Sequence, residues 1–387
     1  MSGLNQTNVI ENTAMCNGCF TCAKVCPSDA IFVYEDKRGH IYPKIDKDKC
    51  VNCNKCRKVC PAVNTYLKDG EIAFYGVRHN RADIVAKSSS GGLFAGLAEV
   101  IFSMGGVCYG AAYEADFSVA HKRAADSREL YALQGSKYAI SNTGDTFKQV
   151  DSDLKKGIPV LYSGTSCIIA GLYSYLKCVG TDISNLYTCD LICSGVPGNK
   201  ILKEYVSVLE QKEKSKCVFV NLRDKSAGWV RGKALESYNF ENGNKVSNQV
   251  YSELYTFRVM NRENCFDCPY IKPAVKCADI TMGDFWGLCE STSKTFFDDK
   301  GCSLAIVHSE KGMKLLKNGD FRMFRIETSE EAMRYNRTEQ HKKIRQHEKF
   351  WYDYEKRGLH YCIKKYTSYG GFLTRLRRKA LMTLKRW

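Results

Sequence analysis

The sequence lacks the features that would place the protein across a membrane or outside the cell. No apolar run reaches about 18 residues, so we expect no membrane-spanning helix. The opening stretch, MSGLNQTNVIENTAMC, contains neither the basic segment nor the apolar segment of a signal peptide. We therefore expect a cytoplasmic protein, in which cysteines stay reduced and disulfides are rare.

Standard nucleotide motifs and a general basic character are also missing. There is no GxGxxG sequence and no P-loop, so no standard dinucleotide or nucleotide site is predicted. The net charge is +16, but residues 341–387 contain 14 Lys and Arg against 3 Asp and Glu, a net +11. Because the rest of the chain is nearly balanced, we expect no nucleic-acid binding.

Cysteine, by contrast, is abundant: the 387 residues include 20 cysteines. Eight of them form two runs with the spacing C-x2-C-x2-C-x3-C-P, namely Cys16, Cys19, Cys22 and Cys26, and Cys50, Cys53, Cys56 and Cys60. This spacing is typical of bacterial ferredoxins with two 4Fe-4S clusters. Zinc is the alternative, but zinc sites usually combine two C-x-x-C pairs across a longer loop, so iron–sulfur clusters are favoured.

In such ferredoxins the fourth cysteine of each run binds the other cluster. We therefore expect Cys60 to complete the cluster held by Cys16, Cys19 and Cys22, and Cys26 to complete the one held by Cys50, Cys53 and Cys56. Between the runs, residues 30–34 and 40–42 predict two strands of a hairpin packed beside the clusters.

After Pro61 predicted strands alternate with predicted helices. Strands are expected at 72–77, 107–113, 117–121, 159–162 and 186–192, with a helix at 93–103 and helices after the last two strands. This alternation indicates an α/β domain, in which ligands bind beyond the carboxyl ends of the strands. The loop 87–92, KSSSGG, opens the helix at 93–103 and offers N–H groups to an anion such as phosphate, or is an ordinary helix cap.

A third metal site is predicted in this domain. Cys265 and Cys268 form a C-x-x-C-P motif, and Cys277 follows nine residues later. The fourth ligand is expected to be Cys167 or Cys193, because both follow predicted strands. The alternative is a set of buried free thiols, which are common in protein cores.

Six segments occur together in one order: KSSSGG (87–92), VCYGAAY (107–113), LQGSKY (133–138), SGTSCIIAGL (163–172), CDLICSGVPG (189–198) and CADITMGDFWG (277–287). Over about residues 70–310 the chain resembles the coenzyme F420 hydrogenase/dehydrogenase beta-subunit family. Two positions depart from it: many relatives have proline where this chain has Ser166, and histidine where it has Ser194.

The resemblance implies a domain that contains FAD with a 4Fe-4S cluster near the flavin. It implies cluster ligation by Cys265, Cys268 and Cys277, with Cys193 or Cys167 as the fourth ligand, and catalytic roles for Lys137 and Cys193. Lys137 would supply positive charge near the pyrophosphate or the reduced flavin. The implied cofactor-binding residues are Ser89, Ser90, Gly91, Gly92, Gly135, Ser136, Lys137, Tyr138, Gly164 and Thr165.

The end of the chain predicts a basic amphipathic helix. Residues 372–387 place apolar side chains at 373, 376, 380 and 384, and Lys and Arg occupy much of the remainder. Such a helix can lie on anionic lipid at the inner face of the membrane, or it can dock on its own protein or on an acidic partner.

These observations together predict an α+β protein with three parts. They are a two-cluster ferredoxin-like domain at 1–67, an α/β flavin-binding domain at 70–310 and a helical basic C-terminal region at 311–387. The expected function is an iron–sulfur flavoprotein oxidoreductase that passes electrons from a donor such as ferredoxin to an unidentified small-molecule substrate, in bacterial surface-polysaccharide metabolism. The alternative is a non-catalytic relay subunit bound to a separate catalytic subunit.

Overall fold

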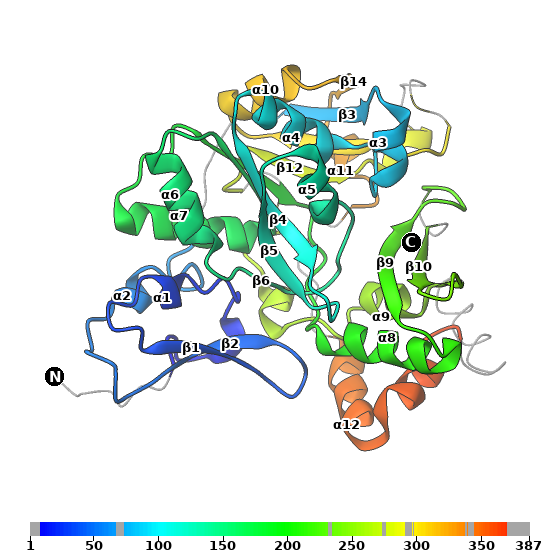
Figure 1. The fold of residues 1–387 in the computed structure, drawn as a ribbon, viewed down its shortest axis with the longest axis horizontal. Helices are drawn as coiled ribbons and strands as arrows, with labels where there is room; N and C mark the ends of the chain where they lie inside the picture. The colour runs from blue at the N-terminus through cyan, green and yellow to red at the C-terminus, as the bar shows by residue number, and fades with distance from the viewer. Residues whose placement is uncertain are drawn as a thin grey trace.

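The computed structural model describes residues 8–66, 73–230, 234–272, 276–290, 296, 298–336, 339 and 344–369. The described chain has an N-terminal domain with a two-stranded sheet, a central nine-stranded sheet flanked by helices, and a smaller region around a three-stranded sheet (Figure 1). This architecture confirms the prediction of a mixed α and β protein that begins with a ferredoxin-like domain.

The N-terminal domain is built from short elements. They are η1 (Thr13–Met15), α1 (Thr21–Lys24), β1 (Ile31–Glu35), β2 (Ile41–Ile45) and α2 (Lys55–Lys58). The predicted hairpin is present, with Ile31 paired to Ile45 and Glu35 to Ile41. Its turn rests on the smaller region, where the Asn199 backbone N–H donates to the Gly39 carbonyl over 3.2 Å.

The central sheet has the strand order β14-β3-β13-β12-β8-β7-β4-β5-β6. Its middle strands β12, β8, β7 and β4 are parallel, as expected for alternating strands and helices. The bounds are β3 (Ala73–His79), β4 (Val107–Tyr113), β5 (Val119–Ala124), β6 (Ser141–Asn142), β7 (Val160–Ser163), β8 (Leu186–Leu191), β12 (Ile280–Asp284), β13 (Ser303–Val307) and β14 (Phe321–Ile326).

Helices cover both faces of this sheet and bury its apolar side chains. One face packs on α4 (Leu93–Ser103) and α10 (Glu310–Lys317), and the other on α6 (Thr146–Lys155) and α7 (Ser166–Val179). Shorter helices fill the connections: α3 (Ala82–Lys87), α5 (Ser127–Leu133) and α11 (Ser329–Met333). The carboxyl end of β7 leads through a short loop into α7, which carries Cys167 in its first turn, and the carboxyl end of β8 leads into the loop that carries Cys193.

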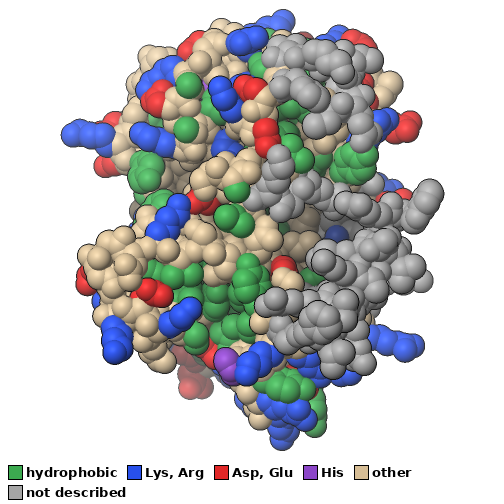
Figure 2. Space-filling view, turned by 90° about the vertical axis from the view of Figure 1, so that its right-hand side faces the viewer, with side chains coloured by type: hydrophobic (Ala, Val, Ile, Leu, Met, Phe, Trp, Pro, Cys, Tyr) green, Lys and Arg blue, Asp and Glu red, His purple; other side chains and the backbone are tan. Residues whose placement is uncertain are grey.

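The smaller region has its own hydrophobic core. It contains β9 (Cys217–Asp224), β10 (Leu235–Phe240), β11 (Lys245–Asn248), α8 (Lys200–Glu213), α9 (Val250–Thr256) and α12 (Arg345–Tyr366), while the short helices η2 (Glu263–Asp267) and η3 (Trp286–Glu290) lie in connecting loops. Hydrophobic side chains gather near the centre of the face shown in Figure 2.

The region after residue 310 differs from the prediction that it is helical. Residues Phe321–Ile326 form β14, an edge strand that pairs antiparallel with β3 in the central sheet. The sequence FRMFRI is rich in β-forming side chains, and its place as an edge strand depends on β3, which lies far earlier in the chain. That predicted helix lies outside the described residues. Within the described residues, no helix is long and apolar enough to cross a membrane.

Candidate metal centres and ligand site

The two N-terminal cysteine runs fold into two copies of one local structure. Helices α1 and α2 each follow a residue in the left-handed conformation, Phe20 with φ 57° and Asn54 with φ 58°. Each helix carries the third cysteine of its run, Cys22 or Cys56. The sequence repeat is therefore also a repeat of backbone geometry.

The eight N-terminal thiols are grouped across the two runs. A cavity is lined by Cys16, Cys19, Cys22 and Cys60 together with apolar side chains. Burial raises the pKa of the Cys60 thiol to about 12, and the nearby thiols of Cys19 and Cys16 add to this increase. The fourth cysteine of the second run thus lies with the first three of the first run, as the crossed ligand pattern requires.

The second group contains the remaining four thiols. Burial raises the pKa of Cys56, with further contributions from Cys53, Cys26 and Cys50. Each group therefore brings four thiols into one place, which costs free energy when the thiols are ionised without a metal. A bound iron cluster offsets this cost because its positive iron ions stabilise the thiolates.

A further group of thiols lies beyond the carboxyl ends of β7 and β8. Burial raises the pKa of Cys167 well above its usual value, and Cys268, Cys193 and Cys265 raise it further. The pKa of Cys265 rises to about 12 through burial and through Cys193 and Cys268. Cys277 lies close by, because its Sγ donates to the Ser166 carbonyl over 3.4 Å. The structure thus brings Cys167 and Cys193, both candidates for the fourth ligand, into one group.

The loop before Cys265 is bonded to the loop around Cys16. Arg262 is fully buried, and its guanidinium donates to the carbonyls of Cys16 over 2.7 Å and Ile41 over 2.8 Å. Asn264 Nδ2 donates to Asn17 Oδ1 over 2.9 Å. A residue directly next to Cys265 is therefore hydrogen-bonded to a residue directly next to Cys16.

A second contact connects the same two groups through α7, which carries Cys167 in its first turn. The Thr21 hydroxyl donates to the Gly171 carbonyl over 2.8 Å. A Cβ atom at Gly171 would come within 2.7 Å of the Cys19 Cβ, so only glycine allows this approach. Sequence inspection gave no reason to single out Gly171, because the contact spans about 150 residues.

The predicted cofactor loops 87–92 and 135–138 lie against each other. The Ser136 backbone N–H donates to Ser89 Oγ over 3.0 Å. Helix α4 begins just after Gly92, at φ 92°, and no described side chain caps it. Its first N–H groups therefore receive no cap from a described side chain.

The remaining predicted residues of this site have specific partners. Burial lowers the pKa of Lys137 to about 7, and its Nζ donates to the carbonyls of Ala132 over 3.0 Å and Gln134 over 2.5 Å. Its side chain thus binds the end of α5. Thr165 Oγ1 lies 3.2 Å from Cys167 Sγ, which connects the Gly164–Thr165 loop to the third thiol group.

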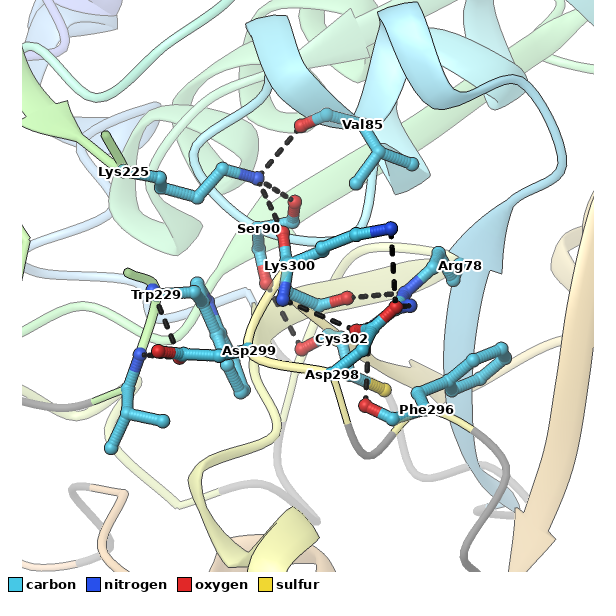
Figure 3. Close-up of polar contacts among 12 residues, drawn as sticks. Arg78, Val85, Ser90, Lys225, Trp229, Phe296, Asp298, Asp299, Lys300 and Cys302 are labelled. Atoms are coloured by element: carbon cyan, nitrogen blue, oxygen red, sulfur yellow. Dashed lines mark hydrogen bonds and ion pairs between the residues drawn. The ribbon is translucent and has the colours of Figure 1, made fainter. Parts of the chain in front are cut away.

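Other residues of this site carry no motif that sequence inspection could find. Tyr138 stacks on Tyr255 with ring centroids 4.3 Å apart. The pKa of Tyr255 is raised well above its usual value by burial and then by Cys193. Lys225 donates to three backbone carbonyls, those of Val85, Ser90 and Lys300 (Figure 3). Tyr255 and Lys225 join the predicted residues of this site only through the fold, and neither belongs to a sequence motif.

Comparison with known proteins agrees with this geometry. Two family models described as 4Fe-4S dicluster domains match residues 15–64 and 42–90. With the grouped thiols, these matches define the chain as an iron–sulfur electron-transfer protein. A third family model, described as the C terminus of the coenzyme F420 hydrogenase/dehydrogenase beta subunit, matches residues 159–356, half of the chain. The chain belongs to this family, which confirms the resemblance found in the sequence.

The chain is also similar to a solved structure, the F420-reducing NiFe hydrogenase complex from Methanosarcina barkeri. The identity is 16%, the match covers 67% of this chain and 84% of that chain, and the TM-score is 0.44. A search of curated proteins found no match.

Proposed function

We propose that the protein is an iron–sulfur flavoprotein oxidoreductase that passes electrons from a ferredoxin-like donor, through its 4Fe-4S clusters and FAD, to a two-electron substrate. The observation that carries this proposal is the set of hydrogen bonds and close contacts between the loops that hold the N-terminal cysteines and the segments that hold the third thiol group. Arg262 and Asn264 connect the two groups within the protein interior, and α7 packs on Cys19. Such contacts hold redox centres at a fixed separation.

The proposed ligands of the third cluster are Cys167, Cys193, Cys265 and Cys268. Cys193 and Cys268 raise the pKa of both Cys167 and Cys265, which is expected when four sulfurs share one location. Cys277 has a different proposed role, because it donates to the carbonyl of Ser166 and so supports the turn that precedes Cys167. This assignment uses both of the alternatives for the fourth ligand and leaves Cys277 outside the ligand set.

The proposed FAD site is formed by the loops 87–92 and 135–138. Their hydroxyl groups, together with the uncapped N-terminus of α4, suit a pyrophosphate group. When bound, FAD supplies the exchange between one-electron and two-electron chemistry, which clusters alone do not provide. Lys137 is bonded to the end of α5. In this proposal Lys137 therefore positions the loop 135–138, which also carries Ser136 and Tyr138.

The second N-terminal thiol group is the proposed entry point for electrons. Cys53 is exposed, whereas Cys19 and Cys22 of the other group are buried. Lys55 and Lys58 lie on α2 beside it, and Val51 and Val63 are exposed. An acidic redox carrier fits such a surface, since opposite charges steer the encounter of electron-transfer proteins.

A second candidate function is electron relay within a larger complex, with catalysis on a separate subunit. The family description favours it, because the matched family is that of a beta subunit. Association with a membrane through 372–387, and a role in surface-polysaccharide metabolism, remain predictions from the sequence. Turnover by the isolated chain would favour the enzyme, whereas co-purification of a catalytic subunit would favour the relay.

Metal and flavin analysis after anaerobic purification tests the main proposal. Three 4Fe-4S clusters and one FAD predict about twelve iron atoms and one flavin per chain. Zinc in place of iron, with no flavin, would refute it. About twelve iron atoms per chain without flavin would refute the flavoenzyme but would be consistent with the electron relay.

A further inference from the structure

Arg223 occupies an unusual position at the end of β9. Its side chain is only 12% exposed, and its Nη1 lies 3.4 Å from an Asp284 carboxylate oxygen. The guanidinium lies 5.0 Å from the centre of the Trp286 ring. Trp286 in turn stacks on Trp229, whose Nε1 donates to the other Asp284 oxygen over 2.8 Å. The charged group is thus held firmly between an aromatic face and one carboxylate.

Two donor atoms of this buried arginine have no partner. Nε and Nη2 of Arg223 are shielded from solvent and have no acceptor with hydrogen-bond geometry within the described chain, although the side chain of Tyr138 lies near enough to interact with the guanidinium. Burial disfavours its charged form, but Asp284 and Tyr138 outweigh this effect and raise the pKa of Arg223. The group therefore stays charged. Because proteins rarely leave buried charged donors unsatisfied, these atoms indicate a missing acceptor.

The missing acceptor would lie where the segments of the proposed FAD site meet. Two residues after Arg223, Lys225 binds the Ser90 carbonyl of the serine–glycine loop (Figure 3). Tyr138 stacks on Tyr255. Burial raises the pKa of Tyr255, and the nearby thiol of Cys193 raises it further. Arg223 interacts electrostatically with both Tyr138 and Tyr255, so its guanidinium lies beside the aromatic pair that borders the proposed FAD site.

We propose that Arg223 binds an oxyanion, a carboxylate or phosphate group, at this site. Nε and Nη2 form one edge of the guanidinium plane, and two parallel N–H groups match the two oxygens of a carboxylate or phosphate. Asp284 and Trp286 fix the plane of that edge, so the donors are oriented before the ligand arrives. This inference rests on the proposed function, because the oxyanion belongs either to FAD or to the two-electron substrate.

The test uses full-length protein, purified anaerobically, with Arg223→Gln and Arg223→Lys. Arg223→Lys keeps the charge but loses the paired donors, and it also serves if the glutamine variant fails to fold. Arg128→Gln is the matched control, because the Arg128 side chain is 94% exposed and lies outside the site. Iron content and circular dichroism establish that each variant is folded.

The first measurement is FAD binding to flavin-depleted protein, by calorimetry. If the oxyanion is a phosphate of FAD, Arg223→Gln weakens FAD binding by roughly tenfold or more, as expected for lost charged hydrogen bonds. The second measurement is binding of inorganic phosphate and acetate to wild-type protein as purified. If the oxyanion belongs to the substrate, FAD binding is unchanged and these probes lose affinity in both Arg223 variants.

Equal binding of FAD, phosphate and acetate by wild type and both Arg223 variants would overturn the inference and assign Arg223 a purely structural role. Failure of the proposed function has a different signature. A wild-type chain without flavin that binds phosphate through Arg223 would refute the flavoprotein but support the oxyanion site.

Discussion

The N-terminal domain and the body of the protein build similar thiol groups in opposite ways. The two N-terminal groups come from one stretch, Cys16 to Cys60, whose repeat sets the backbone of α1 and α2 alike. The third group draws on three separate segments, around Cys167, Cys193 and Cys265–Cys268, which only the folded sheet brings together. Local spacing thus encodes the first pair of sites, and tertiary structure encodes the third.

The two regions also differ in exposure. One N-terminal group reaches the surface at the exposed Cys53, whereas in the third group Cys265 is buried and Cys167, Cys193 and Cys268 are half-buried. This difference fits electron transfer between an outer group, the one that contains Cys53 and can meet a carrier, and an inner group, the third thiol group beside the proposed ligand site.

The largest effect is expected for the ligands of the inner group. Cys265→Ala removes one of four proposed ligands and should lower the iron content by about four atoms per chain. Cys277→Ala should leave the iron content unchanged, because Cys277 is proposed to support a turn. Iron and sulfide analysis of anaerobic samples checks both variants. Loss of iron in Cys277→Ala but not in Cys265→Ala would reverse the ligand assignment.

Arg262→Ala should weaken the contact between the N-terminal domain and the body of the protein. It removes two hydrogen bonds to the carbonyls of Cys16 and Ile41 and the stacking of the guanidinium 3.9 Å over Tyr42. Because the carbonyls stay buried, we expect the free energy of unfolding to fall by about 3–5 kcal/mol. Denaturant unfolding followed by circular dichroism measures this change. Arg128→Ala, at an exposed site, is the control and should change it little.

Glu236 should make the stability of the smaller region depend on pH. Its carboxyl is fully buried, and burial raises its pKa to about 7 despite hydrogen bonds from Tyr251 and Ser252. The folded state holds the proton of Glu236 more tightly than the unfolded state does. The contribution of Glu236 to the free energy of unfolding is therefore full below about pH 4.5 and is lost as the pH rises through 7. The loss is about 3 kcal/mol.

Glu236→Gln should abolish that decline between pH 4.5 and 7. Unfolding at several pH values, in wild type and variant, provides the measurement. An unchanged decline in the variant would show that another group is responsible.

The smallest effect is expected at the outer surface. Reversing the charge of Lys55 and Lys58 to Glu should slow reduction by an acidic ferredoxin several-fold at low salt, with less effect at high salt. Reduction by dithionite and the cluster potentials should not change. The control is charge reversal at Lys212 and Lys214 near the end of α8. Equal slowing in the control would show a general charge effect rather than docking on α2.

The sequence predicts this molecule well where the information is local. The paired cysteine runs, the hairpin at 31–45 and α4 at 93–103 follow from spacing and periodicity within short windows. It predicts less where distant segments meet. Arg223 and Tyr255 have no local pattern, and the close approach of Gly171 to Cys19 cannot be read from its own segment, because each residue acquires its partners only through packing of parts that lie far apart in the chain.

The same limit explains the open choice of ligands. Cys167 and Cys193 both follow strands, so the sequence favoured them equally, and only their common location shows that both can belong to one group. Strand β14 was missed for a related reason, since an edge strand is defined by its partner, and β3 lies far earlier in the chain.

The most direct test of the central claim is low-temperature electron paramagnetic resonance of the anaerobically reduced protein. We predict three reduced 4Fe-4S signals with magnetic interaction between the third cluster and an N-terminal cluster. Cys265→Ala should lose the third signal and that interaction while keeping the two N-terminal signals. Two signals in wild type, identical to those of Cys265→Ala, would contradict the account.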